Sequence, residues 1–215
     1  MQTDMKKAGR IPVSVSTENR IKVRTFGGLT VYRNEVPINI DWESRKARLL
    51  FCCLLVTYDQ WIHRQRVIEA LWPECALDSG EKNFKTTLSR LRKSFSGFGC
   101  LTPVITQGEA VRLNYLSLGL DASEFRNNAT QGIKRLVRGD TKSARKLLET
   151  AQDLYHGSFL PEEPHNKFIA DARYELAEIH TSVIKALEKS YHLDGNSDAL
   201  EAFSFLRNPS LGEHV

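Results

Sequence analysis

The chain has 215 residues, of which 41% are hydrophobic, and a formal net charge of +4. It is long enough to bury one large core or two smaller ones. No apolar run approaches the length that crosses a bilayer, and the polar segment 1–20 lacks the apolar stretch and cleavage site of a signal peptide. These features argue against a secreted or membrane protein, so we expect a cytoplasmic chain with a flexible N-terminal segment at 1–20.

The charge is distributed unevenly along the chain. Residues 1–115 carry 18 Lys and Arg against 11 Asp and Glu, whereas residues 116–215 carry 12 against 15. A basic half followed by a mildly acidic half predicts two units with different partners, and the basic unit is the candidate for nucleic-acid binding. We place the first domain at 21–115 and the second at 120–215.

The first domain begins with strand-forming sequences. The runs IKVRTF, LTVYR and VPINI are rich in β-branched and aromatic residues, and Gly27-Gly28 separates the first two. They predict a small antiparallel sheet. Helical spacing of apolar residues then predicts a helix from Trp42 to Thr57, which either Asp41 or Ser44 could cap.

Two further helices and a hairpin follow. IHRQRVIEALWP predicts a short helix that Pro73 ends, and ECALDSG reads as a loop. Asp78 and Glu81 have the spacing of a capping box and predict the start of a helix that reaches Ser96. VITQ and AVRLNY flank the turn signal Gly108-Glu109. An N-terminal antiparallel sheet, three helices and a C-terminal β-hairpin predict an α+β winged helix, with the hairpin as its wing.

From Leu120 onward the pattern predicts an all-α domain. DASEFRNNATQ reads as a short helix, 141–155 as a second and 168–191 as a long third helix. The loop HGSFLPEEPHN separates the last two, and we expect its Glu162-Glu163 pair to be solvated. A weak self-similarity at an offset of 55 relates Ala144, Leu147 and Leu148 to Ala199, Ala202 and Phe203, which hints at a helical-hairpin array.

The helix predicted at 79–96 carries the clearest functional signal. Between Lys82 and Phe95 it has five basic residues and no acidic one, while Phe84, Leu88 and Leu91 recur on one side. A solvated helix face usually mixes both signs of charge, whereas Lys, Arg, Ser and Thr on one face suit phosphates and base edges. We therefore predict that this helix enters a DNA major groove. The predicted DNA-binding residues are Lys82, Lys85, Thr86, Ser89, Arg90 and Lys93, together with Arg112 on the wing.

Other charged and polar residues leave alternatives open. Arg45, Lys46 and Arg48 crowd the first turn of a predicted helix, where the helix dipole disfavours cations, so either a phosphate or an internal carboxylate should lie nearby. No phosphate-binding loop, metal-ligand spacing or catalytic motif is present, and we expect neither an enzyme nor a metal or cofactor site. The alternative to DNA binding is a helical-repeat adaptor whose basic domain binds an acidic protein.

The sequence also resembles a known family. RKARLLFCCLL, HRQRVIEALWP, KNFKTTLSRLRKSF and VITQGEAVRLN look like the OmpR-type winged-helix DNA-binding domain of SARP-like bacterial transcriptional activators. LDASEF and LYHGSFLP are similar to the bacterial transcriptional activator domain (BTAD), a tetratricopeptide-like (TPR-like) domain that follows in those proteins. The resemblance spans about residues 21–206.

The resemblance implies a regulator of transcription that binds promoter DNA. It implies binding to repeated promoter sites, association of two copies on direct repeats, and recruitment of RNA polymerase. It places the polymerase-contacting loop at 74–79, with Glu74, Cys75, Ala76, Leu77 and Asp78. His63 stands where the family has a Ser or Thr cap, and Phe168 where Trp is common. The chain ends soon after a helix expected near Ser197, whereas a full BTAD continues through further helices. Two alternatives therefore stay open: the helical array is truncated, or a partner completes it.

Overall fold

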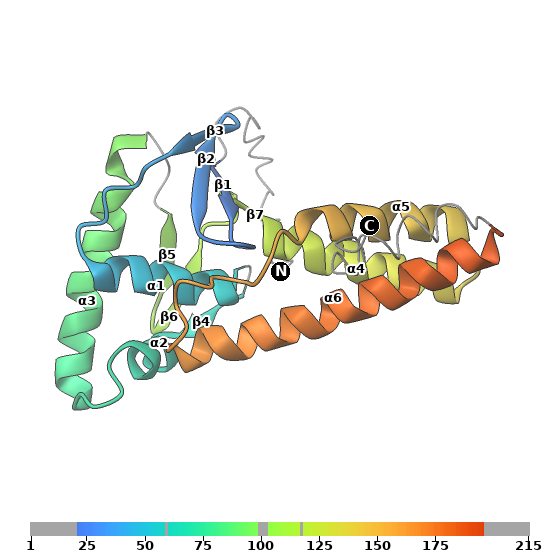
Figure 1. Cartoon of the computed structure of the whole chain (residues 1–215). Helices are drawn as coiled ribbons and strands as arrows, with labels where there is room; N and C mark the ends of the chain where they lie inside the picture. The colour runs from blue at the N-terminus through green and yellow to red at the C-terminus, as the bar shows by residue number, and fades with distance from the viewer. Residues whose placement is uncertain (1–20, 59, 99–102, 117, 196–215) are drawn as a thin grey trace, which may run out of the picture.

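The computed structural model describes residues 21–58, 60–98, 103–116 and 118–195 (Figure 1). A winged-helix half with two small sheets is followed by a layer of three long helices. The order of strands, helices, hairpin and helices is the order predicted. The resemblance of 199–203 to an earlier helix lies outside the described residues.

The first sheet contains one strand that the sequence analysis did not anticipate. Its order is β3-β2-β1-β7, and β1 to β3 form the expected antiparallel meander. β7 pairs in parallel with β1, with Val23 opposite Leu120. The sheet is therefore not purely antiparallel. The bounds are Ile21–Arg24 for β1, Thr30–Arg33 for β2, Val36–Ile38 for β3 and Leu118–Leu120 for β7.

The second sheet is the predicted wing with one added strand. β5 (Val104–Gln107) and β6 (Ala110–Leu113) form the hairpin, and Gly108 at its turn has the positive φ of 57° that glycine tolerates. The short β4 (Ile62–His63) pairs with the other edge of β6. The wing is therefore attached to the start of the helix that follows β4.

The helices of the winged-helix half begin and end close to their predicted limits. α1 (Arg45–Val56) is capped by Ser44, one of the two candidates, whose side chain accepts a hydrogen bond from the Ala47 N–H. α2 (Arg64–Leu71) is capped by His63, whose ring accepts from the Gln65 N–H. Their apolar faces enclose a core in which the rings of Trp42, Phe51 and Phe95 contact one another.

The start of α3 differs from the prediction. α3 (Leu77–Ser94) begins after Ala76, which makes no side-chain cap, so the capping box at Asp78 and Glu81 is wrong. The Glu81 side chain instead accepts a hydrogen bond from Arg64. Leu77 and Asp78 lie in the first turn of the helix, and only Glu74, Cys75 and Ala76 of the expected loop precede it.

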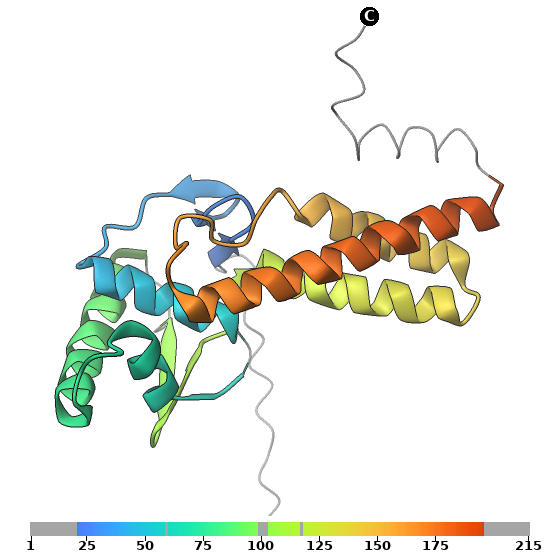
Figure 2. The same cartoon turned by 60° about the horizontal axis from the view of Figure 1, so that its bottom comes forward.

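The helical half consists of α4 (Asp121–Val137), α5 (Thr141–Leu154) and α6 (Lys167–Leu193). α4 is longer than the short helix that we predicted. α6 runs from beside α2, where the Asn166 side chain donates to the Ala70 carbonyl, along both other helices (Figures 1 and 2). Gly132 lets α4 and α5 pack closely, since a Cβ there would lie 2.7 Å from the Leu148 Cγ.

One buried carboxylate joins the two halves. Asp121, at the junction of β7 and α4, is 4% exposed. It accepts hydrogen bonds from the Thr25 N–H at 2.7 Å, the Thr25 hydroxyl at 2.6 Å, the Phe26 N–H at 3.1 Å and the Ala122 N–H at 2.7 Å. These bonds satisfy the backbone at the end of β1 and at the start of α4 together.

The loop before α6 is the second connection between the halves. Gly27 donates to the Ser158 carbonyl and Leu160 donates to the Thr25 carbonyl, so the loop lies against the turn after β1. The Arg173 guanidinium donates to the carbonyls of Phe159, Leu160 and Glu163 and holds the loop from the other side. The winged helix and the helical half therefore share hydrogen bonds from several elements.

Candidate nucleic-acid interface

The inner face of α3 fixes the helix on the winged-helix core. Phe84, Leu88 and Leu91 are buried, as their spacing predicted. Near the N-terminus of α3 the packing on α2 is so close that a Cβ at Gly80 would lie 2.6 Å from Ile68 Cγ2. A larger residue at position 80 would therefore push the helix away from α2.

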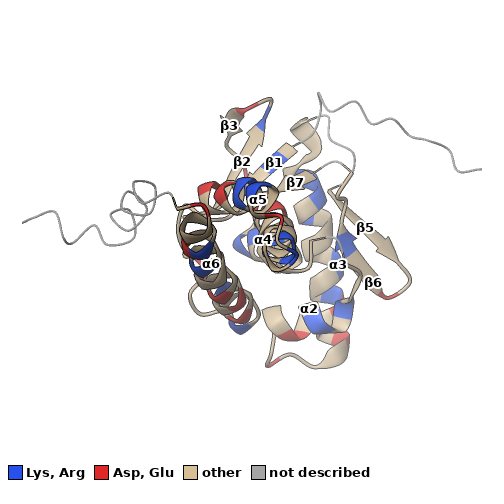
Figure 3. Cartoon of the chain, turned by 90° about the vertical axis from the view of Figure 1, so that its right-hand side faces the viewer, with Lys and Arg blue, Asp and Glu red and all other residues tan. Residues whose placement is uncertain are grey.

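The outer face of α3 carries the residues that we predicted to bind DNA. All six of these side chains on the helix are exposed. Figure 3 shows blue segments for Lys and Arg along α3, whereas α5 and α6 carry both blue and red segments. The exposed residues are Lys82, Lys85, Thr86, Ser89, Arg90 and Lys93. The structure thus leaves this face open, and contact with DNA stays a prediction.

The cations on this face are not equivalent. Lys93 Nζ lies 2.9 Å from the Glu43 carboxylate, which precedes α1. Lys82, Lys85 and Arg90 form no ion pair with any residue that the structure describes. The positive field of the face therefore comes mainly from these three residues, with Lys93 already partly compensated.

The predicted wing residue, Arg112, is held by two aromatic rings. Its guanidinium lies 4.5 Å from the centre of the Trp61 ring and 4.8 Å from that of Tyr115, as in cation–π contacts. Sequence reasoning did not find this stack, because Trp61 lies far from Arg112 along the chain. Arg112 is half-buried, and its contact with DNA stays a prediction.

The cations at the start of α1 have different partners. The Arg48 guanidinium binds the carboxylates of Glu162, at 2.9 Å, and Glu163, so an internal carboxylate is its partner. The expectation that the Glu162-Glu163 pair is solvated is wrong for Glu163, whose side chain is 11% exposed. Glu162 is exposed, and both carboxylates bind Arg48 and hold α1 against the loop before α6. Lys46 donates to the Leu71 carbonyl at 2.6 Å. Arg45 is exposed and makes no ion pair within the described residues.

An ionic group that sequence reasoning missed lies between α3 and the wing. Arg64, the first residue of α2, binds Glu81 of α3 at 2.8 Å and Glu109 of the wing turn at 3.2 Å. The His63 ring also lies 2.9 Å from the Glu109 carboxylate. At the other end of the helix, Arg92 donates to the Val104 carbonyl at the base of the wing. Two arginines thus connect α3 with the two ends of the hairpin.

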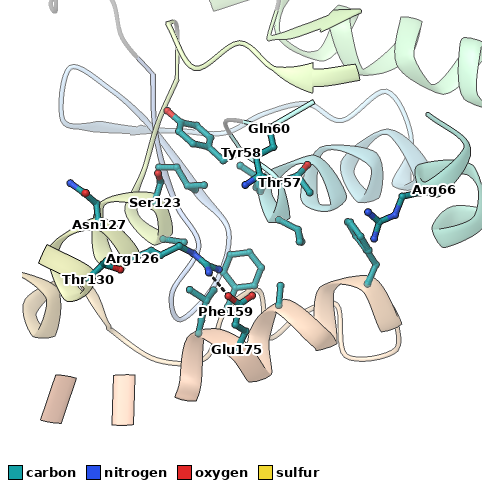
Figure 4. Close-up of a pocket in the computed structure, with 17 residues that line it drawn as sticks. Thr57, Tyr58, Gln60, Arg66, Ser123, Arg126, Asn127, Thr130, Phe159 and Glu175 are labelled. Carbon is teal, nitrogen blue, oxygen red and sulfur yellow. Dashed lines mark hydrogen bonds and ion pairs between the residues drawn. The ribbon is translucent and has the colours of Figure 1, made fainter. Parts of the chain in front are cut away.

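A separate cleft of about 590 Å³ lies between the two halves (Figure 4). Its walls come from the end of α1, from α2, from one face of α4 and from α6. Arg126 and Glu175 pair across it, and the Arg66 guanidinium lies over the Phe168 ring at 6.0 Å. The cleft is lined by the side chains of both domains, and it lies apart from the outer face of α3.

Two of the cysteines, Cys52 and Cys53, behave as core residues, whereas Cys75 is exposed. Cys52 and Cys53 are fully buried in α1, and burial raises the pKa of the Cys53 thiol to about 12 and also raises the pKa of Cys52. The described residues contain no cluster of three metal-binding side chains. None of the described helices combines the length and apolar character that a membrane crossing requires.

Comparisons with known proteins agree with the resemblance seen in the sequence. Residues 120–206 match the family model of the bacterial transcriptional activator domain. Among solved structures, the chain is similar to Mycobacterium tuberculosis EmbR in complex with a low affinity phosphopeptide. The TM-score is 0.71 and the sequence identity 20%, over 87% of this chain and 51% of that one. Comparison with curated protein sequences gave no match.

These findings confirm the predicted fold, a winged helix followed by a TPR-like helical domain, and the resemblance to SARP-like bacterial transcriptional activators. The chain spans about half the length of the solved structure that it matches.

Proposed function

We propose that this chain, which carries a bacterial transcriptional activator domain at 120–206, is a sequence-specific DNA-binding regulator of transcription. α3 would lie in the major groove, with Lys82, Lys85 and Arg90 at phosphates or guanine edges and Thr86 and Ser89 at other polar groups. The wing would meet the adjacent minor groove near Arg112. The protein itself has no catalytic role in this proposal.

The observation that carries the proposal is the free outer face of α3. Three of its cations have no carboxylate partner among the described residues, while Arg48, Arg64 and Arg173 are all bound within the fold. A cation that lacks an internal partner can neutralise a phosphate without breaking a contact in the protein. Such neutralisation releases counterions and supplies most of the non-specific affinity for DNA.

Activation is the second part of the proposal. The segment Glu74–Ala76 and the first turn of α3, with Leu77 and Asp78, would contact RNA polymerase, since the resemblance places the activating loop there. Leu77 is 64% exposed, which makes it available to a partner. Binding of two copies to direct repeats is also part of this proposal.

Selection of genomic DNA fragments by the purified chain would test the DNA-binding part. We expect enrichment of a short repeated motif and, for about five neutralised phosphates, a fall of log K with log salt at a slope of roughly −4 to −5. The variant Lys82→Ala/Lys85→Ala/Arg90→Ala should lower the affinity about a hundredfold and make the slope shallower by about 3.

A matched variant controls for net charge. Lys142→Ala/Lys146→Ala/Lys189→Ala removes the same charge from exposed positions on α5 and α6, and it should bind the motif as the unchanged protein does. Equal losses for both variants would overturn the role of α3. Absence of any selective binding by the unchanged chain would favour the adaptor with an acidic protein partner.

A further inference from the structure

In the proposed function α3 and the wing would meet DNA at neighbouring grooves, so the distance between them would matter for binding. Among the described residues, β4 pairs with β6 directly before α2. The first residue of α2 contacts both α3 and the wing turn. This residue, Arg64, was not among the predicted site residues.

The geometry around Arg64 connects three elements. Its Nε donates to Glu81 Oε1 of α3 at 2.8 Å, and its Nη2 donates to Glu109 Oε1 of the wing turn at 3.2 Å. Its backbone N–H donates to the Glu109 carbonyl at 2.8 Å. The side chains of Arg64 and Glu81 are 25% and 28% exposed, so water screens their pairing only in part.

Glu81 depends on this contact. Its other oxygen, Oε2, is buried and has no hydrogen-bond partner among the described atoms, so Arg64 supplies the hydrogen bond that its carboxylate has. Without Arg64 the half-buried Glu81 carboxylate would lose its cation, and Glu109 would keep its contact with the His63 ring. Both carboxylates would then add negative charge beside the predicted DNA surface. The planar guanidinium suits this place, because its separate N–H groups reach two carboxylates at once.

We propose that Arg64 is a positioning residue for DNA binding, which fixes the spacing between α3 and the wing turn by binding Glu81 and Glu109 together. This inference rests on the proposed function. Arg92 holds the opposite end of α3 to the base of the wing through the Val104 carbonyl, so loss of Arg64 should loosen the wing at its turn and leave its base in place.

The first experiment measures the spacing without DNA. Backbone amide hydrogen exchange would be compared in the unchanged chain, in Arg64→Met and in the matched control Arg66→Met. Arg66 lies on the same helix, is exposed and makes no ion pair within the described residues. Of these three proteins, we expect faster exchange at the wing turn and the strand ends beside it for Arg64→Met alone. Exchange at the base of the wing and in α4 to α6 should be unchanged.

Glu109→Gln provides a second variant, which weakens the same link from the exposed wing side. It should raise exchange at the wing turn in the same direction. Exchange at the wing that is unchanged in both Arg64→Met and Glu109→Gln would overturn the link.

The second experiment asks whether the link matters for DNA. The selected site would be compared with a duplex shortened on the side that the wing contacts. Arg64→Met should lower affinity about tenfold on the full site and little on the shortened one, because the shortened duplex lacks the wing contact. Arg64→Lys should fall between, since an ammonium group does not span both carboxylates with the same geometry.

Equal losses on both duplexes would mean that Arg64 acts by charge or stability alone, and would overturn the positioning role. Failure of the unchanged chain to select any DNA would overturn the proposed function, and with it this role of Arg64. The exchange experiment would still show whether Arg64 holds the wing, so the two failures are distinguishable.

Discussion

The junction between the two halves and the outer face of α3 use charged residues in opposite ways. At the junction Asp121 is buried and accepts four hydrogen bonds, and Arg48 and Arg173 are bound by carboxylates or carbonyls of the loop before α6. On α3 the residues Lys82 and Arg90 are exposed and have no ion-pair partner within the described structure.

Internal contacts distinguish the charges that hold the fold from the charges that are available for a partner. A charge with several internal hydrogen bonds contributes to stability, and its loss leaves buried groups unsatisfied. A charge without internal contacts costs little to remove from the folded chain but can contribute to binding. Mutations at the junction should therefore lower the free energy of unfolding, whereas mutations on the outer face of α3 should lower the affinity for DNA.

The largest effect is expected where the junction is broken at Asp121. Asp121→Ala leaves the N–H groups of Thr25 and Phe26 without their acceptor in a buried place, and it should lower the free energy of unfolding by about 3 kcal/mol or more. Urea denaturation followed by circular dichroism would measure this change. Asp171→Ala on the exposed face of α6 is the control, and it should stay within about 0.5 kcal/mol. A similar stability for both variants would contradict the role given to the buried carboxylate.

A smaller loss of stability is expected on α1, where Arg48 has internal partners and Arg45 has none among the described residues. Arg48→Met removes the partner of Glu162 and Glu163 and should lower the free energy of unfolding by about 1–2 kcal/mol, while the affinity for DNA changes little. Arg45→Met, one turn earlier on α1, should leave stability within about 0.5 kcal/mol, because Arg45 is exposed and makes no ion pair among the described residues. Thermal denaturation and DNA titration of both variants would check this pair. Equal stability losses would mean that the junction does not depend on the Arg48 ion pairs.

The smallest effect concerns Lys93, the cation of α3 that has an internal partner. Glu43→Gln should free Lys93 and raise the affinity for the selected DNA about threefold at low salt, with the gain shrinking as salt increases. Glu124→Gln on the exposed face of α4 is the control, and it should leave the affinity unchanged. Titrations at two salt concentrations would measure the gain. A weaker affinity for Glu43→Gln would show that Glu43 orients Lys93 for binding instead of competing with DNA.

Much of the candidate interface could be predicted because it depends on local periodicity. The spacing of Phe84, Leu88 and Leu91 determined which face of α3 is buried, and so which side chains are exposed. The turn at Gly108-Glu109 and the cap at Ser44 follow from the conformational preferences of glycine and serine. These features need contacts between residues only a few positions apart.

The features that were missed depend on residues far apart in the chain. β7 is three residues long, and its pairing with β1 joins segments about a hundred residues apart, so the run Leu118–Leu120 carries no strand signal of its own. The start of α3 was misplaced because its capping position, Ala76, has no side chain that can cap. The partners of Arg48 lie 114 and 115 residues away.

Local sequence patterns suffice to predict the two-part organisation, the order of elements and the basic outer face of α3, because hydrophobic spacing and turn residues act between neighbouring residues. Which charges remain available for a partner depends on the tertiary fold. Arg48, Arg64 and Lys93 read alike as surface cations, yet one holds the junction, one joins α3 to the wing and one is paired with Glu43. The physical reason is that an ion pair depends on distance in space, and distance between remote segments is set only when the core has brought them together.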